Sequence, residues 1–202
     1  MVPSNSPGPR PSRAVYTRTG DDGTTGLLYG GRVGKDSTGP DAYGAVDEAV
    51  SALGLARAEA ERGSELDQLL VRLQRELFVV GAELATAPEN RAKLEAGVTL
   101  VTTAMVDALE PIIDDVTERF EPPREFVLPG ENRVAAALDV ARAVVRRAER
   151  RCVAATRDGW LVADDGSEVV RYLNRLADLV YTLARWQEGT FLPVRTRPGD
   201  SP

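Results

Sequence analysis

Apolar residues recur along most of the chain at alternating steps of four and three, the spacing of one face of an α-helix. One such stripe consists of Leu66, Leu70, Leu73, Leu77, Val80 and Leu84. A second consists of Val134, Leu138, Ala141, Val145, Ala148 and Cys152, and a third of Val169, Leu173, Leu176, Val180, Leu183 and Trp186. Because each stripe needs an apolar partner surface, the pattern predicts helices that pack against one another.

The stripes and the residues that interrupt them predict about five helical segments. These segments cover residues 41–62, 64–87, 98–120, 131–157 and 166–189, with Ser64 as the cap of the second. Pro111 lacks an amide hydrogen in the middle of the third segment, so we expect it to kink or divide that helix. Few segments alternate with a period of two, so no sheet is expected. Long amphipathic helices with short connections favour an all-α antiparallel bundle.

The two ends of the chain and one internal stretch lack this pattern. Residues 1–13 hold four Pro and three Ser with little to bury, so we expect a disordered lead. Residues 14–190 are expected to form the helical domain, and residues 191–202 a flexible polar tail. Within the domain, residues 14–40 are dense in Gly and Thr and lack helical periodicity, which predicts a structured loop or a set of turns.

Composition narrows the classes of function. The 202 residues carry a net charge of −6, which argues against a general nucleic-acid binder, and 43% are apolar, enough for a core. The absence of His excludes His-based triads and zinc sites, and a single Cys permits no internal disulfide. Neither a bilayer-spanning apolar run nor a secretory signal is present. We therefore expect a soluble cytoplasmic protein without nucleic-acid or membrane partners.

An unusual density of arginine marks residues 141–151, ARAVVRRAERR. Arg142, Arg146 and Arg150, called the arginine stripe below, are four apart, and Glu149 falls on the same side of the helix. Like charges at this spacing repel, whereas guanidinium groups suit phosphate oxygens. A solvated helix face and an anion site are both open interpretations. The stripe lies beside the apolar stripe, which leans towards a groove or a subunit interface.

The Gly- and Thr-rich stretch also has two interpretations. Glycines let backbone amides approach a phosphate closely, and Lys35 could add a positive charge. The stretch is not a Walker A loop, because Tyr29 and Asp36 stand where that motif needs Gly and Ser or Thr. A phosphate-binding loop and a mobile surface loop therefore both remain open.

Other polar and aromatic residues are ambiguous by pattern alone. Asn174 and Asp178 lie one turn apart on what we expect to be a polar side, near Arg185 and two other arginines. A structural salt-bridge ladder is the favoured interpretation there, and Asn174 gains interest only if it faces the arginine stripe. Phe126 precedes a tight turn, where most aromatic residues fill the core. Asp47 and the adjacent Glu48 could pair with the stripe or be solvated.

Taken together, these motifs resemble one family. YTRTGDDGTT, GRVGKD, AYGAVDE, FVLPG, ARAVVRRAER and YLNRLADLVYTLAR follow one another over about residues 15–187. In this the chain resembles the PduO-type ATP:corrinoid adenosyltransferases, which make adenosylcobalamin. The resemblance implies a five-helix bundle that forms a homotrimer, with each active site between two subunits.

The resemblance also assigns roles to residues. The N-terminal loop of one chain and the arginine helix of its neighbour would bind ATP with Mg²⁺ on its phosphates. The implied nucleotide-binding residues are Thr17, Arg18, Thr19, Gly20, Thr25, Gly26, Lys35, Arg146, Arg147, Glu149, Arg150 and Asn174. Arg142 would pair with Asp47 across the interface, and Phe126 would press on the corrin face. No protein side chain is expected to bind a metal.

The implied reaction suits a chain without His. Cobalt in cob(I)alamin attacks the ribose 5′ carbon of ATP and expels tripolyphosphate, so no basic side chain or protein nucleophile is needed. Arg146, Lys35 and Mg²⁺ would stabilise the leaving triphosphate, and Glu149 would orient the arginines or the nucleotide. Apolar groups around Phe126 would exclude water and ease reduction of cobalt. A non-catalytic corrinoid carrier that binds ATP as a regulator is the alternative. A corrinoid reductase and an adenosylcobalamin-dependent mutase are candidate partners.

Three positions depart from the pattern of the family. Asp22 stands where a lysine is common, residues 37–41 replace the usual link to the first helix, and Asp139 stands where a histidine is frequent. None of these departures removes an arginine from the stripe, so the implied transfer reaction is kept.

Overall fold

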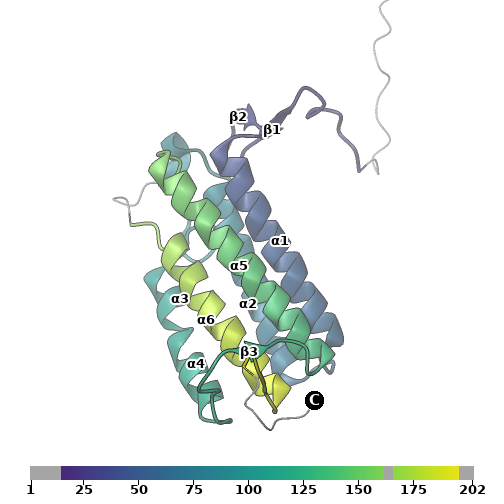
Figure 1. Ribbon diagram of the computed structural model, residues 1–202. Helices are drawn as coiled ribbons and strands as arrows, with labels where there is room; N and C mark the ends of the chain where they lie inside the picture. The colour runs from purple at the N-terminus through teal and green to yellow at the C-terminus, as the bar shows by residue number, and fades with distance from the viewer. Residues whose placement is uncertain (1–14, 162–165, 196–202) are drawn as a thin grey trace, which may run out of the picture.

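Four long helices form the body of the computed structural model, which describes residues 15–161 and 166–195. They are α1 (Thr38–Glu59), α2 (Glu65–Leu84), α5 (Arg133–Arg157) and α6 (Val169–Glu188). Helix α5 packs against both α1 and α6, and α2 packs against α1 (Figure 1). The prediction of a mainly helical fold is therefore confirmed. None of the described helices combines the length and apolar character that crossing a membrane requires.

The long helices follow from the apolar stripes and from local caps. The stripe residues of α2, from Leu66 to Leu84, are all buried in the core. Ser64 caps α2, as predicted, because its Oγ accepts a hydrogen bond from the Asp67 amide at 3.2 Å. Asn132 caps α5 in the same way, with Oδ1 accepting from the Ala135 amide at 2.9 Å. These caps fix where two helices begin, and burial of the stripes fixes which face turns inward.

The third predicted helix is two short helices. They are α3 (Thr103–Asp107) and α4 (Glu110–Thr117), and the 3₁₀ helix η1 (Pro88–Lys93) precedes them. Pro111 lies in the first turn of α4, where a missing amide hydrogen costs no helical hydrogen bond. The expected division at Pro111 is confirmed, but residues 98–102 are not helical. Thr102 caps α3 through a hydrogen bond from the Met105 amide, so that helix begins later than predicted.

The expectation that no sheet forms is wrong. Strand β1 (Thr24–Gly26) pairs antiparallel with β2 (Arg32–Gly34), and β3 (Val127–Leu128) pairs antiparallel with β4 (Leu192–Pro193). Strands of two or three residues are too short to show a period-two pattern. Strand β4 lies in residues that we expected to be a flexible tail. The predicted lead at residues 1–13 and the last residues, 196–202, lie outside the described residues.

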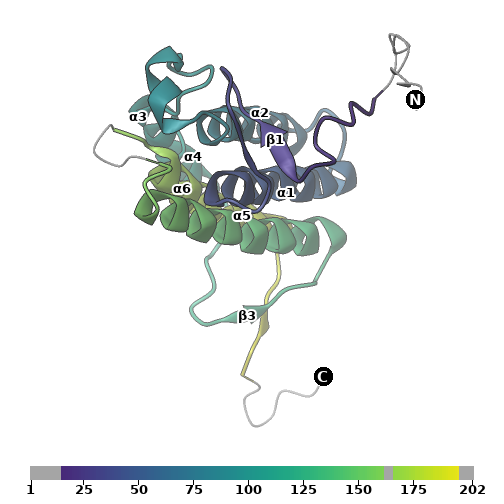
Figure 2. The same cartoon turned by 90° about the horizontal axis from the view of Figure 1, so that it is seen from above.

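The two small sheets lie at opposite ends of the helical body. Strands β1 and β2 lie by the start of α1, and we call this the β1 end (Figure 1). Strand β3 precedes the start of α5 and lies by the end of α6, and we call this the β3 end. Seen from above, β3 stands clear of the helices on the side of α5 (Figure 2). The Gly- and Thr-rich loop and Phe126 are thus far apart within one chain.

Candidate functional site

The N-terminal loop, residues 15–37, is tied to the β1 end of the helices. The Leu28 amide donates a hydrogen bond to the Ala85 carbonyl at 2.9 Å. The Tyr29 hydroxyl and the Thr99 hydroxyl share a hydrogen bond at 3.2 Å. These contacts join the loop to the end of α2 and to the segment before α3. The residues that we expected to form a structured loop or a set of turns thus contain strands β1 and β2 and are anchored to the helices by hydrogen bonds.

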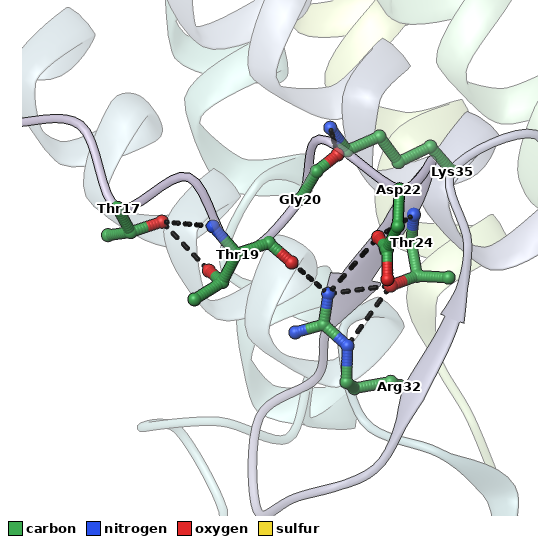
Figure 3. A network of polar contacts seen from close by, with 7 residues as sticks. All are labelled: Thr17, Thr19, Gly20, Asp22, Thr24, Arg32 and Lys35. Atoms are coloured by element: carbon green, nitrogen blue, oxygen red, sulfur yellow. Dashed lines mark hydrogen bonds and ion pairs between the residues drawn. The ribbon is translucent and has the colours of Figure 1, made fainter. Parts of the chain in front are cut away.

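Lys35 holds the first part of this loop in place. Its Nζ donates a hydrogen bond to the Gly20 carbonyl at 2.7 Å (Figure 3). A Cβ at position 20 would lie 3.0 Å from that Nζ and 3.1 Å from the Thr24 carbonyl oxygen, so glycine suits this close approach. Thr17 and Thr19 share a hydroxyl hydrogen bond at 2.8 Å, and both are exposed. The predicted nucleotide-binding residues Thr17, Thr19, Gly20 and Lys35 therefore lie in one network.

The other predicted residues of the loop lie beside this network. Thr25 and Gly26 form the end of β1, and Arg18 lies with its guanidinium 5.2 Å from the centre of the Tyr16 ring. Arg18 has a φ of 59°, which is uncommon for a residue other than glycine. An exposed arginine held in this conformation keeps its charge at the surface of the loop.

Arg32 organises the loop, and the sequence analysis missed it. Its Nε donates to the Thr24 hydroxyl at 3.1 Å, and its terminal nitrogen donates to the Thr19 carbonyl (Figure 3). Asp22 accepts hydrogen bonds from the Thr24 amide at 2.9 Å and the Thr24 hydroxyl at 2.8 Å. These hydrogen bonds hold the pKa of Asp22 below its ordinary value. Asp22 thus has a local structural role in the loop. The signal for Arg32 was its place within the glycine-flanked run GRVG.

Two arginines next to the stripe are neutralised by acidic residues of α1. Arg147 forms an ion pair with Glu48, and Arg151 forms one with Asp41 at 3.1 Å. Both pairs cross from α5 to α1 within a single chain. Glu48 therefore pairs with an arginine next to the stripe, and not with one of the stripe residues.

Two residues of the arginine stripe have no acidic partner in the described chain. Arg146 and Arg150 are exposed, and within residues 15–161 and 166–195 neither makes an ion pair. Beside them, Asn174 of α6 donates a hydrogen bond from Nδ2 to Glu149 Oε1 at 3.0 Å. Asn174 therefore faces the stripe, which is the condition that gives it functional interest. Nearby Arg175 pairs with Asp178 at 3.0 Å and Arg171 with Glu168 at 2.7 Å, so salt bridges also lie along α6.

Arg142, the third residue of the stripe, is less exposed and has an acidic partner. Its Nε lies 3.2 Å from Asp139 Oδ1, and its side chain is half-buried. Asp47, its expected partner across an interface, is exposed on α1. We expected Arg185 near the polar side of α6, and this prediction is wrong. Arg185 is buried and pairs with Asp139.

Phe126 is not a core residue, so that interpretation is wrong. It is 89% exposed, directly before strand β3. The Val194 amide donates to the Phe126 carbonyl at 2.9 Å, and β4 continues the pairing. A large aromatic ring is thus presented to solvent by a segment that two parts of the chain hold in place.

These side chains can stabilise negative charge, but they offer no protein nucleophile. Cys152 is buried, and burial raises the pKa of its thiol to about 12, so it stays protonated at neutral pH. Among the residues that the structure describes, no group of three or more Cys, Asp or Glu side chains could hold a metal ion. The exposed cations of the stripe and the loop are therefore the candidate groups for binding an anion.

Known proteins share both the sequence and the fold of this chain. A family model described as cobalamin adenosyltransferase matches residues 15–187. A corrinoid adenosyltransferase of Citrobacter freundii is 43% identical over 176 residues, which cover 87% of this chain and 96% of that protein. A corrinoid adenosyltransferase of Bacillus subtilis is 39% identical, with 85% of this chain and 84% of that protein covered.

A solved structure extends the likeness to three dimensions. It is a variant PduO-type ATP:corrinoid adenosyltransferase from Lactobacillus reuteri complexed with cobalamin and ATP. It aligns with a TM-score of 0.80 at 29% identity, covering 91% of this chain and 100% of that chain. Residues 15–187, which the family model matches, include the N-terminal loop, the arginine stripe and Phe126. The chain therefore belongs to the cobalamin adenosyltransferase family and is an enzyme of that family.

Proposed function

We propose that this chain transfers the 5′-deoxyadenosyl group of ATP to the cobalt of cob(I)alamin and releases tripolyphosphate. The observation that carries this proposal is the exposed, uncompensated charge of Arg146 and Arg150 beside the Glu149–Asn174 hydrogen bond. Guanidinium groups on a rigid helix suit a polyphosphate, because each can donate two parallel hydrogen bonds to its oxygens. The L. reuteri relative, whose structure contains cobalamin and ATP, supports the same pair of substrates.

The active site is proposed to lie between two copies of the chain in a homotrimer. Within the described residues, no hydrogen bond or ion pair joins residues 15–37 to the arginine stripe. We therefore propose that the pocket uses the loop of one copy and helix α5 of another. A closed ring of three copies would give three equivalent sites of this kind. Asp47 of one copy would then meet Arg142 of its neighbour.

The reaction needs charge stabilisation and positioning rather than proton transfer. The electron pair of cobalt(I) forms the new bond to the 5′ carbon, and the electrons of the broken carbon–oxygen bond leave with tripolyphosphate. Arg146 would bind the oxygens that gain this charge, with Lys35 released from the Gly20 carbonyl to assist. Thr19 and neighbouring loop residues would position the ribose and phosphates. Mg²⁺ would be bound mainly by the phosphate oxygens.

Phe126 would act on the corrinoid rather than on ATP. An exposed ring beside a paired strand can lie against the face of the corrin and displace water from the cobalt. Removal of an axial ligand leaves cobalt four-coordinate and therefore easier to reduce to the +1 state. Phe126 at the β3 end of one copy and the N-terminal loop at the β1 end of another would meet only when two copies associate.

Measurement of both products tests this function. The full chain is mixed with Mg-ATP and chemically reduced cob(I)alamin, and tripolyphosphate and adenosylcobalamin are quantified. We expect the two products in equal amounts. A corrinoid carrier that uses ATP only as a regulator would bind both molecules without releasing tripolyphosphate, and that result would contradict the proposal. The Arg157→Ala variant, which removes an exposed arginine at the end of the same helix, is the matched control and should keep its turnover.

A further inference from the structure

A group of buried charges joins α5 to α6 at the β3 end, and the reaction itself does not use it. Arg185 is buried, with 2% of its side chain exposed, and it pairs with both Asp139 and Glu188. Its Nε lies 3.0 Å from Glu188 Oε2, and the Glu188 side chain is fully buried. We call Asp139, Arg185 and Glu188 the buried triad.

The triad reaches the arginine stripe through one carboxylate. Asp139 Oδ2 is paired with Arg185, whereas Asp139 Oδ1 lies 3.2 Å from Nε of Arg142. The side chain of Arg142 is 34% exposed, so it lies at the boundary between the core and the surface. Asp139 therefore connects a fully buried arginine to a residue of the proposed interface.

Stability alone does not explain such a triad. Removing charged groups from water is costly, and buried ion pairs can often be replaced by apolar side chains without loss of stability. Burial, with the carboxylate of Asp139 nearby, raises the pKa of Glu188, and the attraction of Arg185 only partly opposes this. The arrangement instead provides fixed geometry, since both oxygens of Asp139 are held in one orientation.

We propose that Asp139 is a positioning residue that the buried Arg185 holds in place, and that it orients Arg142 for the contact between two copies. This inference rests on the proposed function, because it assigns a cause to the geometry of Arg142. Anchoring through Nε leaves the two terminal nitrogens of Arg142 for a second carboxylate, such as Asp47 of another copy. Without that anchor, the long side chain is free to adopt several rotamers, and the interface and the substrates bound there are less well positioned.

The test removes the triad while the core stays filled. The variant Asp139→Leu/Arg185→Met/Glu188→Gln replaces every charge of the triad with a neutral side chain. We expect it to fold with a Tm close to that of the wild type, and its kcat to fall by about tenfold with little change in the KM for ATP. Asp139→Asn, which keeps the shape of the side chain and the Arg185–Glu188 pair, is the second variant if the triple variant does not fold.

A double-mutant cycle with Arg142→Ala decides whether the triad acts through Arg142. If it does, the triad variants reduce kcat in the wild type but cause no further loss when Arg142 is already Ala. Equal losses in both backgrounds, or full turnover of the folded triad variants, would overturn the inference. Full turnover of Arg142→Ala would overturn it too. Failure of the proposed function is distinguishable, because the wild-type chain would then release no tripolyphosphate.

A matched ion pair elsewhere controls for general effects of removing charge. Arg57 of α1 and Asp67 of α2 are paired at 2.7 Å, with Asp67 largely buried. The variant Arg57→Met/Asp67→Leu removes this pair without affecting α5. We expect it to change the Tm but to leave kcat unaltered, in contrast to the triad variants.

Discussion

The arginines of this chain occupy two contrasting environments. On α5, Arg146 and Arg150 are exposed and make no ion pair within the described chain. On α6, Arg185 is almost fully buried, and two carboxylates surround it. The same side chain is thus left with its full charge in one place and neutralised in the other.

The difference shows what each charge is able to do. An exposed guanidinium keeps its hydration and its freedom to bind an anion, so its removal costs little stability. A buried one must be paired, and removal of a single partner leaves an uncompensated charge in the core. We therefore expect variants of the stripe to lose activity and keep their stability. Variants of buried residues should lose stability and keep their activity, except those that act through Arg142.

The largest effect is expected for Arg146→Ala. Loss of one preorganised donor to the leaving group should lower kcat at saturating ATP by at least about 100-fold. Because Arg146 is exposed, the Tm and the association of subunits should change little. Steady-state kinetics and thermal unfolding measure both properties. Wild-type turnover by this variant would rule out the role in charge stabilisation.

Stability should fall most clearly for Gly39→Ala, beneath the N-terminal loop. A Cβ there would lie 2.2 Å from Cε2 of the Trp160 ring, whose Nε1 donates to the Leu84 carbonyl at 2.8 Å. Overpacking of this kind costs about 1–3 kcal/mol in the free energy of unfolding, measured with urea. Gly44→Ala in the same helix is the control, because its Cβ would meet no atom within 4 Å. Equal stability of the two variants would show that Trp160 moves aside freely.

A smaller effect, specific to the corrinoid, is expected for Phe126→Ala. The ring is exposed in one chain, so the Tm and the Kd for ATP should stay close to the wild-type values. Formation of four-coordinate cobalt, followed by its absorption spectrum with ATP bound, should fall by about tenfold, since fewer apolar contacts exclude water. A variant that lost ATP affinity but still formed four-coordinate cobalt would contradict the proposed role of Phe126.

The smallest effect concerns the pH dependence of stability. Burial raises the pKa of Glu188 above its ordinary value of 4.5, so the folded chain binds this proton more tightly than the unfolded chain does. Stability from this group is therefore present at low pH and is lost as the pH rises from about 4.5 through the pKa of the folded state. Glu188→Gln should remove this part of the dependence of the free energy of unfolding on pH. Urea unfolding at several pH values measures that dependence. An unchanged slope would show that Glu188 does not titrate in this way.

Features set by local sequence were predictable. The leucine spacing and the Ser64 cap fix α2 because helical periodicity and capping depend on neighbours along the chain. The stripe on α5 was predictable for the same reason. Its proximity to Asn174 was expected only through the family resemblance, and the hydrogen bond to Glu149 now places these side chains together.

Features set by distant partners were not predictable. Arg185 lies next to apolar positions of α6, but its burial depends on Asp139, which is 46 residues away in another helix. The strand pairing of β3 with β4 likewise joins segments that only the folded chain brings together. The exposure of Phe126 accompanies that pairing, because the hydrogen bond from the Val194 amide to the Phe126 carbonyl fixes this segment outside the core.

The central claim, that each site uses the loop of one copy and the arginine stripe of another, is tested most directly by mixing two inactive variants. Lys35→Ala damages the loop, and Arg146→Ala damages the stripe. After joint unfolding and refolding at equal amounts, a site between copies predicts recovery of roughly a quarter of wild-type turnover, because that share of random interfaces combines two intact surfaces. If both surfaces belonged to the same chain, every site would carry one substitution. The mixture would then stay as inactive as its components, and the account would be contradicted.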